Sequence, residues 1–107
     1  MLFICLLFLV GCNRATIREE AINGARIAID EGDFYRGSLL LVRGGCADLH
    51  AQSVYLIHMN NYRNNSNLTG MIYSWKNIYL LDATEDFIKT VAYEMLDTVI
   101  NQLVFSE

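Results

Sequence analysis

The chain of 107 residues contains no proline. Proline removes a backbone donor and clashes with the preceding helical turn, so its absence favours uninterrupted helices. Potential metal ligands are also few, with two histidines, His50 and His58, and three cysteines, Cys5, Cys12 and Cys46. A metal centre needs three or four ligands, which this sequence does not supply in one cluster. The length suits one domain.

Motifs for catalysis are missing as well. Cys46 and His50 are four residues apart, a spacing that places two side chains on one face of a helix, but no third group accompanies them. Gly44-Gly45 lacks the lysine and the spacing of a phosphate-binding loop, and there is no serine nucleophile motif. We therefore expect no metal, no cofactor, no small-molecule substrate and no enzymatic activity. Cys46 is expected to be either a buried small side chain or an intermolecular partner.

Positive charge is scarce in the second part of the chain. Up to Arg63, six arginines balance six acidic residues, whereas beyond it only Lys76 and Lys89 oppose six acids. The net charge of −4 therefore comes from the C-terminal part. Because an acidic surface repels phosphate backbones, no nucleic-acid partner is expected.

The N-terminus is one apolar run, Met1 to Val10, followed by Gly11 and Cys12. Ten residues are about half of the roughly 20 that a membrane-spanning helix needs, and they suit the apolar region of a signal peptide. The ending Leu9-Val10-Gly11-Cys12 resembles the lipobox of bacterial lipoproteins. That resemblance implies a diacylglycerol on the Cys12 thiol and cleavage just before it. An ordinary secretory signal and a buried N-terminal helix are the alternatives.

The lipobox resemblance divides the chain into three parts. Residues 1–11 would be a signal peptide, residues 12–16 the lipidated cysteine with a short tether, and residues 17–107 a single helical domain. Asn13 stands where an aspartate in Gram-negative lipoproteins signals retention in the inner membrane. The resemblance therefore implies a lipid-anchored envelope protein, at the outer membrane and facing the periplasm.

Helix-start and helix-stop residues mark the first part of the domain. Thr16 and Glu19 fit a capping box that would start a helix, and Gly32 would end it. Asp33 would cap a second helix that continues to about Leu41. The buried face of the first helix should include the small residues at helical spacing, Ala21, Ala25 and Ala28.

The middle of the chain predicts two further helices on either side of the polar stretch Asn60–Asn67, which should contain the longest loop. The apolar set of the third helix is Ala47, Ala51, Val54, Tyr55 and Met59, and that of the fourth is Leu68, Met71, Ile72, Trp75, Ile78 and Tyr79.

A long amphipathic helix is predicted at the C-terminus, starting near Asp82 and Glu85 because acids stabilise the positive end of a helix. Its apolar stripe consists of Ile88, Val91, Met95, Val99 and Leu103, widened by Ala92 and Leu96.

Two segments of the chain resemble each other at an offset of 34 residues. Gly32-Asp33-Phe34 with Gly37 resembles the turn between the two helices of a tetratricopeptide repeat, and Ser66-Asn67-Leu68 with Met71 stands 34 residues later. The resemblance implies a small array of helical hairpins that the last helix closes. The predicted fold class is therefore all-α.

An α+β fold is the alternative that the sequence leaves open. Leu39–Arg43, Val54–Met59 and Ile72–Leu81 would then form a three-stranded sheet under two helices, since short apolar runs also suit strands.

Aromatic residues gather in one third of the chain, and Tyr and Trp favour contacts with partner proteins. Tyr55, Tyr62, Trp75 and Tyr79 are therefore the predicted partner-binding residues. The sequence predicts a protein-protein interaction module in the cell envelope. A periplasmic inhibitor of the immunity or exclusion type is the alternative, because small size and acidic character suit it.

Overall fold

The computed structural model describes the backbone of residues 2–105 and the side chains of residues 16–104. This part of the chain forms five helices and no strand, with the bounds α1 Leu2–Asp30, α2 Phe34–Arg43, α3 Ala47–Asn64, α4 Leu68–Leu80 and α5 Phe87–Phe105. The all-α prediction is confirmed. The three-stranded alternative is wrong, because its three segments lie in α2, α3 and α4, where each buries one helical stripe.

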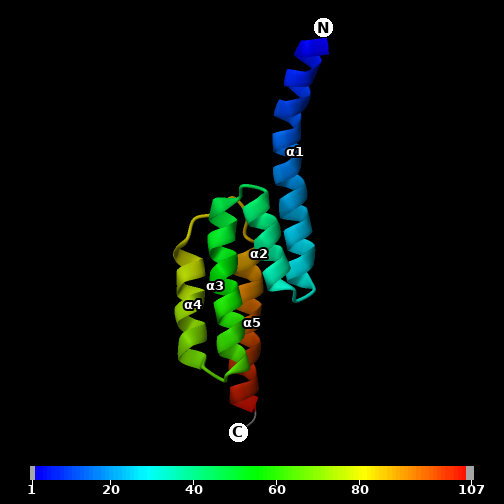
Figure 1. Ribbon diagram of the computed structural model, residues 1–107. Helices are drawn as coiled ribbons and strands as arrows, with labels where there is room; N and C mark the ends of the chain where they lie inside the picture. The colour runs from blue at the N-terminus through cyan, green and yellow to red at the C-terminus, as the bar shows by residue number, and fades with distance from the viewer. Residues whose placement is uncertain (1, 106–107) are drawn as a thin grey trace.

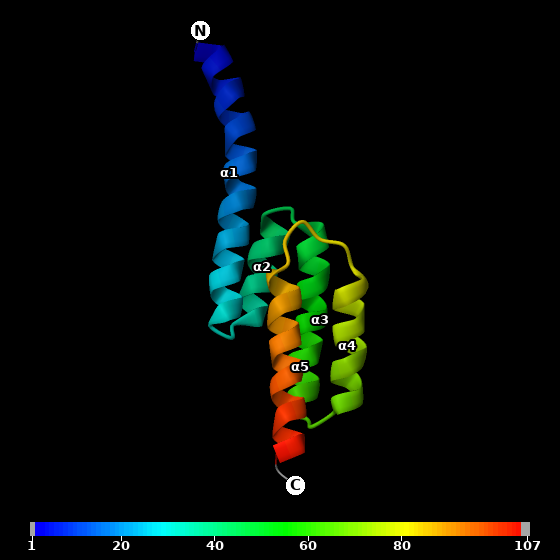
Figure 2. The same ribbon diagram turned by 180° about the vertical axis from the view of Figure 1, so that it is seen from behind.

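Consecutive helices run in opposite directions (Figure 1). The pairs α1–α2 and α3–α4 each form a hairpin, and α2 packs against α3 to join the two hairpins. Helix α5 packs against α4, α3 and α1, so it covers the side of the hairpins that Figure 2 turns toward the viewer. The described ends of α1 and α5 lie at opposite ends of the molecule (Figure 1).

The turns of the two hairpins have the same geometry. Gly32 and Ser66 both adopt the left-handed conformation, with φ of 86° and 56°. The residues that follow them, Asp33 and Asn67, cap α2 and α4 by accepting a hydrogen bond from the backbone three residues on. Backbone bonds repeat too: Asp33 N donates to Ala28 O and Asn67 N to Tyr62 O, both at 2.8 Å. Each of these two bonds joins residues five positions apart, which is the outer hydrogen bond of a Schellman cap.

Three predicted boundaries differ from the structure. Helix α1 continues without a break through Thr16, so the Thr16–Glu19 pair does not start a helix here. Helix α5 begins at Phe87, after the loop that contains Asp82 and Glu85. The polar stretch Asn60–Asn67 does contain a loop, at Asn65–Asn67, but α3 continues to Asn64, and the loop between α4 and α5 at 81–86 is longer.

The buried face of α3 also differs from the prediction. It consists of Leu49, Gln52, Ser53, Leu56 and Met59, so only Met59 belongs to the predicted set. Gln52 is fully buried, and its Nε2 donates to the carbonyl oxygens of Ile78 at 3.2 Å and Leu81 at 3.0 Å. A polar side chain can occupy this face because its amide group donates to carbonyl oxygens at the end of α4, although its Oε1 has no partner.

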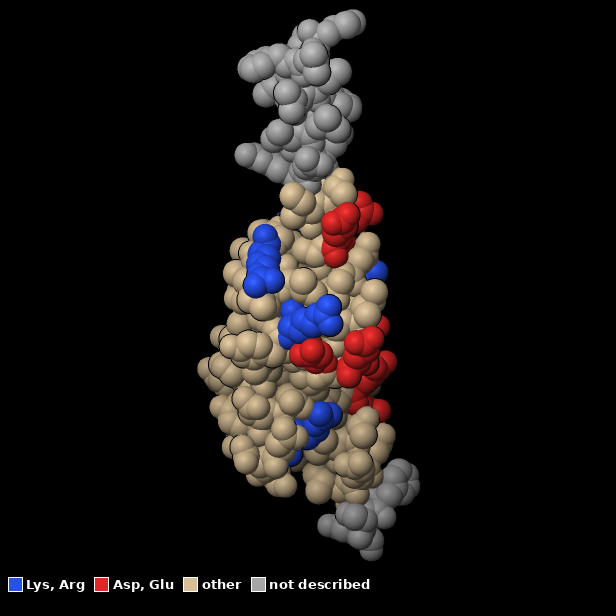
Figure 3. All heavy atoms as spheres, turned by 45° about the vertical axis from the view of Figure 1, so that its right-hand side comes forward, with Lys and Arg blue, Asp and Glu red and all other residues tan. Residues whose placement is uncertain are grey.

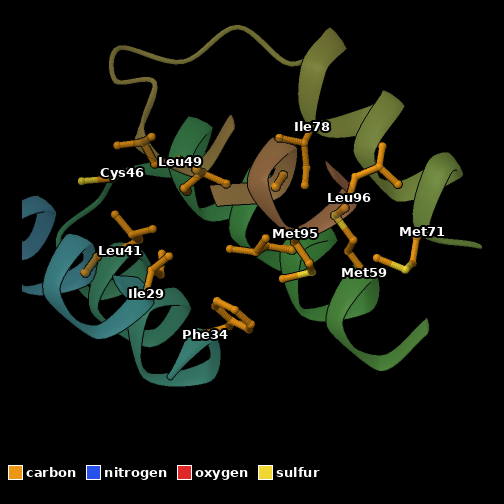
Figure 4. Close-up of a cluster of buried hydrophobic side chains, with 14 residues drawn as sticks. Ile29, Phe34, Leu41, Cys46, Leu49, Met59, Met71, Ile78, Met95 and Leu96 are labelled. Carbon is orange, nitrogen blue, oxygen red and sulfur yellow. The ribbon is translucent and has the colours of Figure 1, made fainter. Parts of the chain in front are cut away.

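One core cluster runs through the helices (Figure 4). It includes Ile29 from α1, Leu41 from α2, Leu49 from α3, Met71 from α4 and Met95 from α5. The predicted stripe of α5 is confirmed at Ile88, Ala92, Met95 and Leu96, which are all buried, and Leu103 at its far end is half exposed. Burial of such side chains contributes about 1.5–3 kcal/mol each relative to exposure.

Candidate functional site

Two of the four predicted partner-binding residues lie together on α4. The rings of Trp75 and Tyr79 are one turn apart and stack, with centroids 5.7 Å apart and planes inclined by 25°. Trp75 is half-buried against the core, whereas Tyr79 is 63% exposed. A stacked pair of this kind fixes both rings and lowers the entropy that a ligand contact would cost.

The stacked pair forms one wall of an open pocket of about 370 Å³ between α4 and α5. We call it the α4–α5 pocket. Trp75, Ile78 and Tyr79 line it from α4, and Lys89, Thr90 and Tyr93 line it from α5. Small-ligand and side-chain sites have this character, with apolar and aromatic walls and a few polar groups at the rim.

Lys89 supplies the positive charge of the α4–α5 pocket. Its ammonium lies 5.5 Å from the centroid of the Tyr79 ring, which is the distance of a cation–π contact. Among the described side chains, no carboxylate forms an ion pair with Lys89. The pocket therefore combines an apolar floor with a cation whose charge an incoming carboxylate would balance.

Tyr62 and Tyr55 are not among the residues that line the pocket. The ring of Tyr62 lies directly against the backbone of Gly70, where any larger residue would collide with it, so it joins α3 to α4. Tyr55 is partly buried against the core and meets the ring of His58 edge to face, with centroids 6.2 Å apart. The structure thus brings together Trp75 and Tyr79 but not the other two.

Sequence reasoning did not identify Lys89, Thr90 and Tyr93. Lys89 and Tyr93 are four residues apart and lie off the apolar stripe of α5, so they share an outer face of that helix. The four-residue spacing could have indicated that Lys89 and Tyr93 share one face of α5. It gave no indication that α4 would supply the facing wall, because helix pairing is a tertiary property.

Cys46 and His50 do not form a reactive pair. Cys46 is fully buried at the N-cap of α3, with its Sγ 3.7 Å from the carbonyl oxygen of Gly44. The Nδ1 of His50 lies 3.1 Å from the Ser38 carbonyl oxygen and 3.2 Å from the Ser38 hydroxyl. Cys46 is therefore a core residue, as one of the two sequence interpretations had it. Within the described residues, no three potential ligands cluster for a metal.

The loop between α4 and α5 is fastened to α1 and α3. Asp48 at the start of α3 accepts hydrogen bonds from the Thr84 amide at 3.0 Å and the Thr84 hydroxyl at 3.4 Å. Arg26 of α1 pairs with Glu85 at 3.4 Å and lies over the Phe87 ring. These contacts hold the start of α5 in place, and with it one wall of the α4–α5 pocket.

Opposing effects act on the pKa of Asp48. Burial raises it, but the backbone amides of Thr84, Leu49 and Asp48 itself and the Arg18 guanidinium hold the pKa below the ordinary value. The side chain therefore stays ionised over the physiological range.

Charged side chains elsewhere are mixed in sign on the face that Figure 3 shows, where acidic groups gather along one edge beside basic ones.

No protein-family model, curated protein or solved structure matches the chain. The predicted lipidation site, Cys12, lies outside the side chains that the structure describes. Within the described residues, no helix combines the length and the apolar character that crossing a bilayer requires.

Proposed function

We propose that this chain is a lipid-anchored protein of the bacterial cell envelope that binds a protein partner through the α4–α5 pocket. The observation that carries the proposal is the stacked Trp75–Tyr79 pair beside Lys89 in an open apolar pocket. Tryptophan and tyrosine dominate protein-protein contacts because they contribute large rigid surfaces with polar edges. A pocket of this size accepts one anchoring side chain of a partner.

The anchor in this proposal is a diacylglycerol on Cys12, with residues 1–11 removed as a signal peptide. The apolar run and the sequence Leu9-Val10-Gly11-Cys12 support it. Asn13 supports an outer-membrane location facing the periplasm. The domain would then meet partners that are themselves fixed at the envelope, where a weak contact suffices because both molecules stay near one surface.

The helical hairpins support a relationship to tetratricopeptide-like arrays. The turns at Gly32-Asp33 and Ser66-Asn67 share a side-chain cap at the 34-residue spacing of that family, which the intervening turn at Gly45-Cys46 lacks although it has the same left-handed residue and backbone bond. Helix α5 would serve as the long amphipathic cap that covers the open side of the two hairpins. Binding of other proteins is the usual use of such arrays, so this relationship favours an interaction module.

Site-specific photo-crosslinking in living cells tests the binding site. A photoreactive residue at Thr90 should capture a discrete partner, and one at Tyr73 should not, because Thr90 is exposed and lines the pocket whereas Tyr73 is 61% exposed but lies outside it. The changes Tyr79→Ala and Lys89→Glu should reduce capture about tenfold, as expected for residues at the centre of a contact. Equal capture from both positions, or none from either, would refute the site.

Globomycin inhibits the peptidase that cleaves lipoproteins, so it tests the anchor separately. Mass analysis of the N-terminus should show a lipid on Cys12 in untreated cells and an uncleaved precursor in treated cells. Recovery of an unmodified Cys12 thiol would refute the anchor and leave the binding site to be judged by the crosslinks.

An inhibitor of the immunity or exclusion type is the second candidate. Asp82, Asp86, Glu94 and Asp97 are all exposed, so the acidic excess of the C-terminal part faces solvent. An acidic surface of this kind suits a basic toxin, with which it would associate rapidly. A neighbouring toxin gene, and protection of cells by co-expression of this chain, would favour this candidate over the general interaction module.

A further inference from the structure

Helix α2 carries an apolar stripe on its outer face. Tyr35, Leu39 and Val42 follow the spacing i, i+4, i+7 and are 75%, 41% and 50% exposed. They line a groove of about 330 Å³ whose other wall comes from α3, including Val54 and Ile57. We call it the α2–α3 groove. An apolar stripe of this length on a short helix costs solubility unless another surface covers it.

Positive charge flanks the apolar stripe of α2 on the side away from α3. Arg36 and Arg43 lie beside the apolar stripe, because at 100° per residue both fall on the same side of it. Neither forms an ion pair with any described carboxylate. The groove therefore suits a helix that is apolar on one face and acidic along one flank.

Helix α5 of the same chain has these properties on its outer face. Tyr93, Ile100 and Val104 are 59%, 40% and 62% exposed and fall on one side of the helix, with Asp97 between them and Glu94 along the flank. We call Tyr93, Ile100 and Val104 the α5 stripe, and Glu94 and Asp97 its acidic flank. From Tyr93 to Ile100 it spans seven residues, about 10 Å, which equals the distance from Tyr35 to Val42 on α2. The acidic flank is complementary to Arg36 and Arg43.

The geometry also fixes the direction of docking. Viewed from the N-terminus, the charged residues lie clockwise of the apolar stripe on both α2 and α5. When two such helices face each other, their charged flanks lie on the same side of the contact only if the helices are antiparallel. Opposite charges therefore meet only in the antiparallel arrangement. Within one chain α2 and α5 run in opposite directions (Figure 1). Two copies that stand in the same orientation therefore bring α2 of one and α5 of the other together antiparallel. Figures 1 and 2 place α3 and α5 on opposite sides of the molecule, so one copy can use both surfaces at once.

We propose that the α5 stripe of one copy docks in the α2–α3 groove of the next copy, so that the protein forms a head-to-tail row of like-oriented molecules. The contact is heterologous, because different surfaces meet, and such contacts form open rows unless a rotation closes them. The described starts of α1 then all lie along the same side of the row. Tyr93 also borders the α4–α5 pocket, so a docked copy covers one wall of it.

Disulfide crosslinking of the full chain in its own membranes tests this contact. A chain with both Leu39→Cys and Ile100→Cys should give a ladder of dimers, trimers and longer products after mild oxidation. Each single variant alone should give only background, because Leu39 does not meet Leu39 in a heterologous contact. The pair Leu39→Cys with Tyr73→Cys is the matched control, since Tyr73 is exposed on α4 outside both surfaces, and it should give no ladder.

Charge reversal then tests the docking direction. Arg36→Glu with Arg43→Glu should reduce the ladder about tenfold, and Glu94→Arg with Asp97→Arg should do the same. The chain that carries all four changes should recover it, because the opposite charges are restored with reversed sign. All four residues are exposed, so the helical circular dichroism signal should not change. A missing ladder, a ladder that charge reversal does not alter, or a strong dimer from Leu39→Cys alone would overturn the proposal, and would leave the groove to a different protein.

Discussion

The two helical hairpins share one turn geometry but pack through different side chains. The α1–α2 hairpin is joined by small residues: Ala25 is fully buried, and a side chain at Gly37 or Gly44 would collide with Ile29 or Ala21. The α3–α4 hairpin is joined by a ring and a buried amide, with Tyr62 on Gly70 and Gln52 on the end of α4. The turn therefore sets how the helices reverse, and the interface residues set how close they come.

The largest expected effect is at Gln52, in the α3–α4 hairpin. Gln52→Ala removes the hydrogen bonds to Ile78 and Leu81 and empties the space of a fully buried side chain, whereas the Ile78 carbonyl keeps its bond from the Leu81 amide at 3.3 Å. We expect a loss of about 3 kcal/mol in the free energy of unfolding, measured by urea denaturation. Gln102→Ala, at an exposed position of α5, is the control and should change it by less than about 0.5 kcal/mol. An effect at Gln52 no larger than the control would show that these bonds do not join the hairpin.

The next effect concerns the close approach in the α1–α2 hairpin. Gly37→Leu inserts a side chain where Ile29 already lies, so we expect a loss of about 2 kcal/mol in the same measurement. The comparison is Gly24→Ala, whose added Cβ meets only the flexible end of Leu40 and should lower the free energy of unfolding far less. Gly32 does not serve as the comparison, because its positive φ would add backbone strain. Similar losses at Gly37 and Gly24 would contradict the difference in packing.

A smaller pair of effects compares the two turns directly. Gly32→Ser places a side chain at a positive φ and should cost about 1 kcal/mol, whereas Ser66→Gly removes one from the equivalent position and should stabilise the fold by about 0.5–1 kcal/mol. The reason is that the left-handed conformation brings Cβ close to the following carbonyl oxygen. Changes of the same sign at both positions would show that the two turns are not equivalent.

The smallest effect is the acid sensitivity that Asp48 confers. Its pKa in the folded state lies below the ordinary value of 3.8, so its contribution to stability is complete above that pH and is lost as the pH falls through the folded pKa. We expect the thermal midpoint of the unaltered chain to fall more steeply below about pH 4 than that of Asp48→Asn. Parallel pH profiles for the two proteins would show that the carboxylate does not hold the α4–α5 loop.

Much of the helical framework was predictable from local sequence. Asp33 caps α2 as expected, and the spacing of Ala21, Ala25 and Ala28 identified the buried face of α1, because each signal depends on neighbours in the chain. The face of α3 was predicted wrongly, since its true stripe contains Gln52 and Ser53, which no apolar pattern selects. For the candidate site, Trp75 and Tyr79 were identified from composition, but Lys89, Thr90 and Tyr93 were not.

The sequence by itself favoured an all-α fold and located the turn at Gly32 and the Asp33 cap of α2, because backbone conformation and helix ends respond to side chains within a few positions. Only the tertiary structure decided that Gln52 would be buried, since its partners are carbonyl groups on α4. It likewise decided that α5 would face Trp75 and Tyr79 and form the α4–α5 pocket. Contacts between segments far apart in the chain depend on how whole helix faces fit together, and local spacing does not encode that fit.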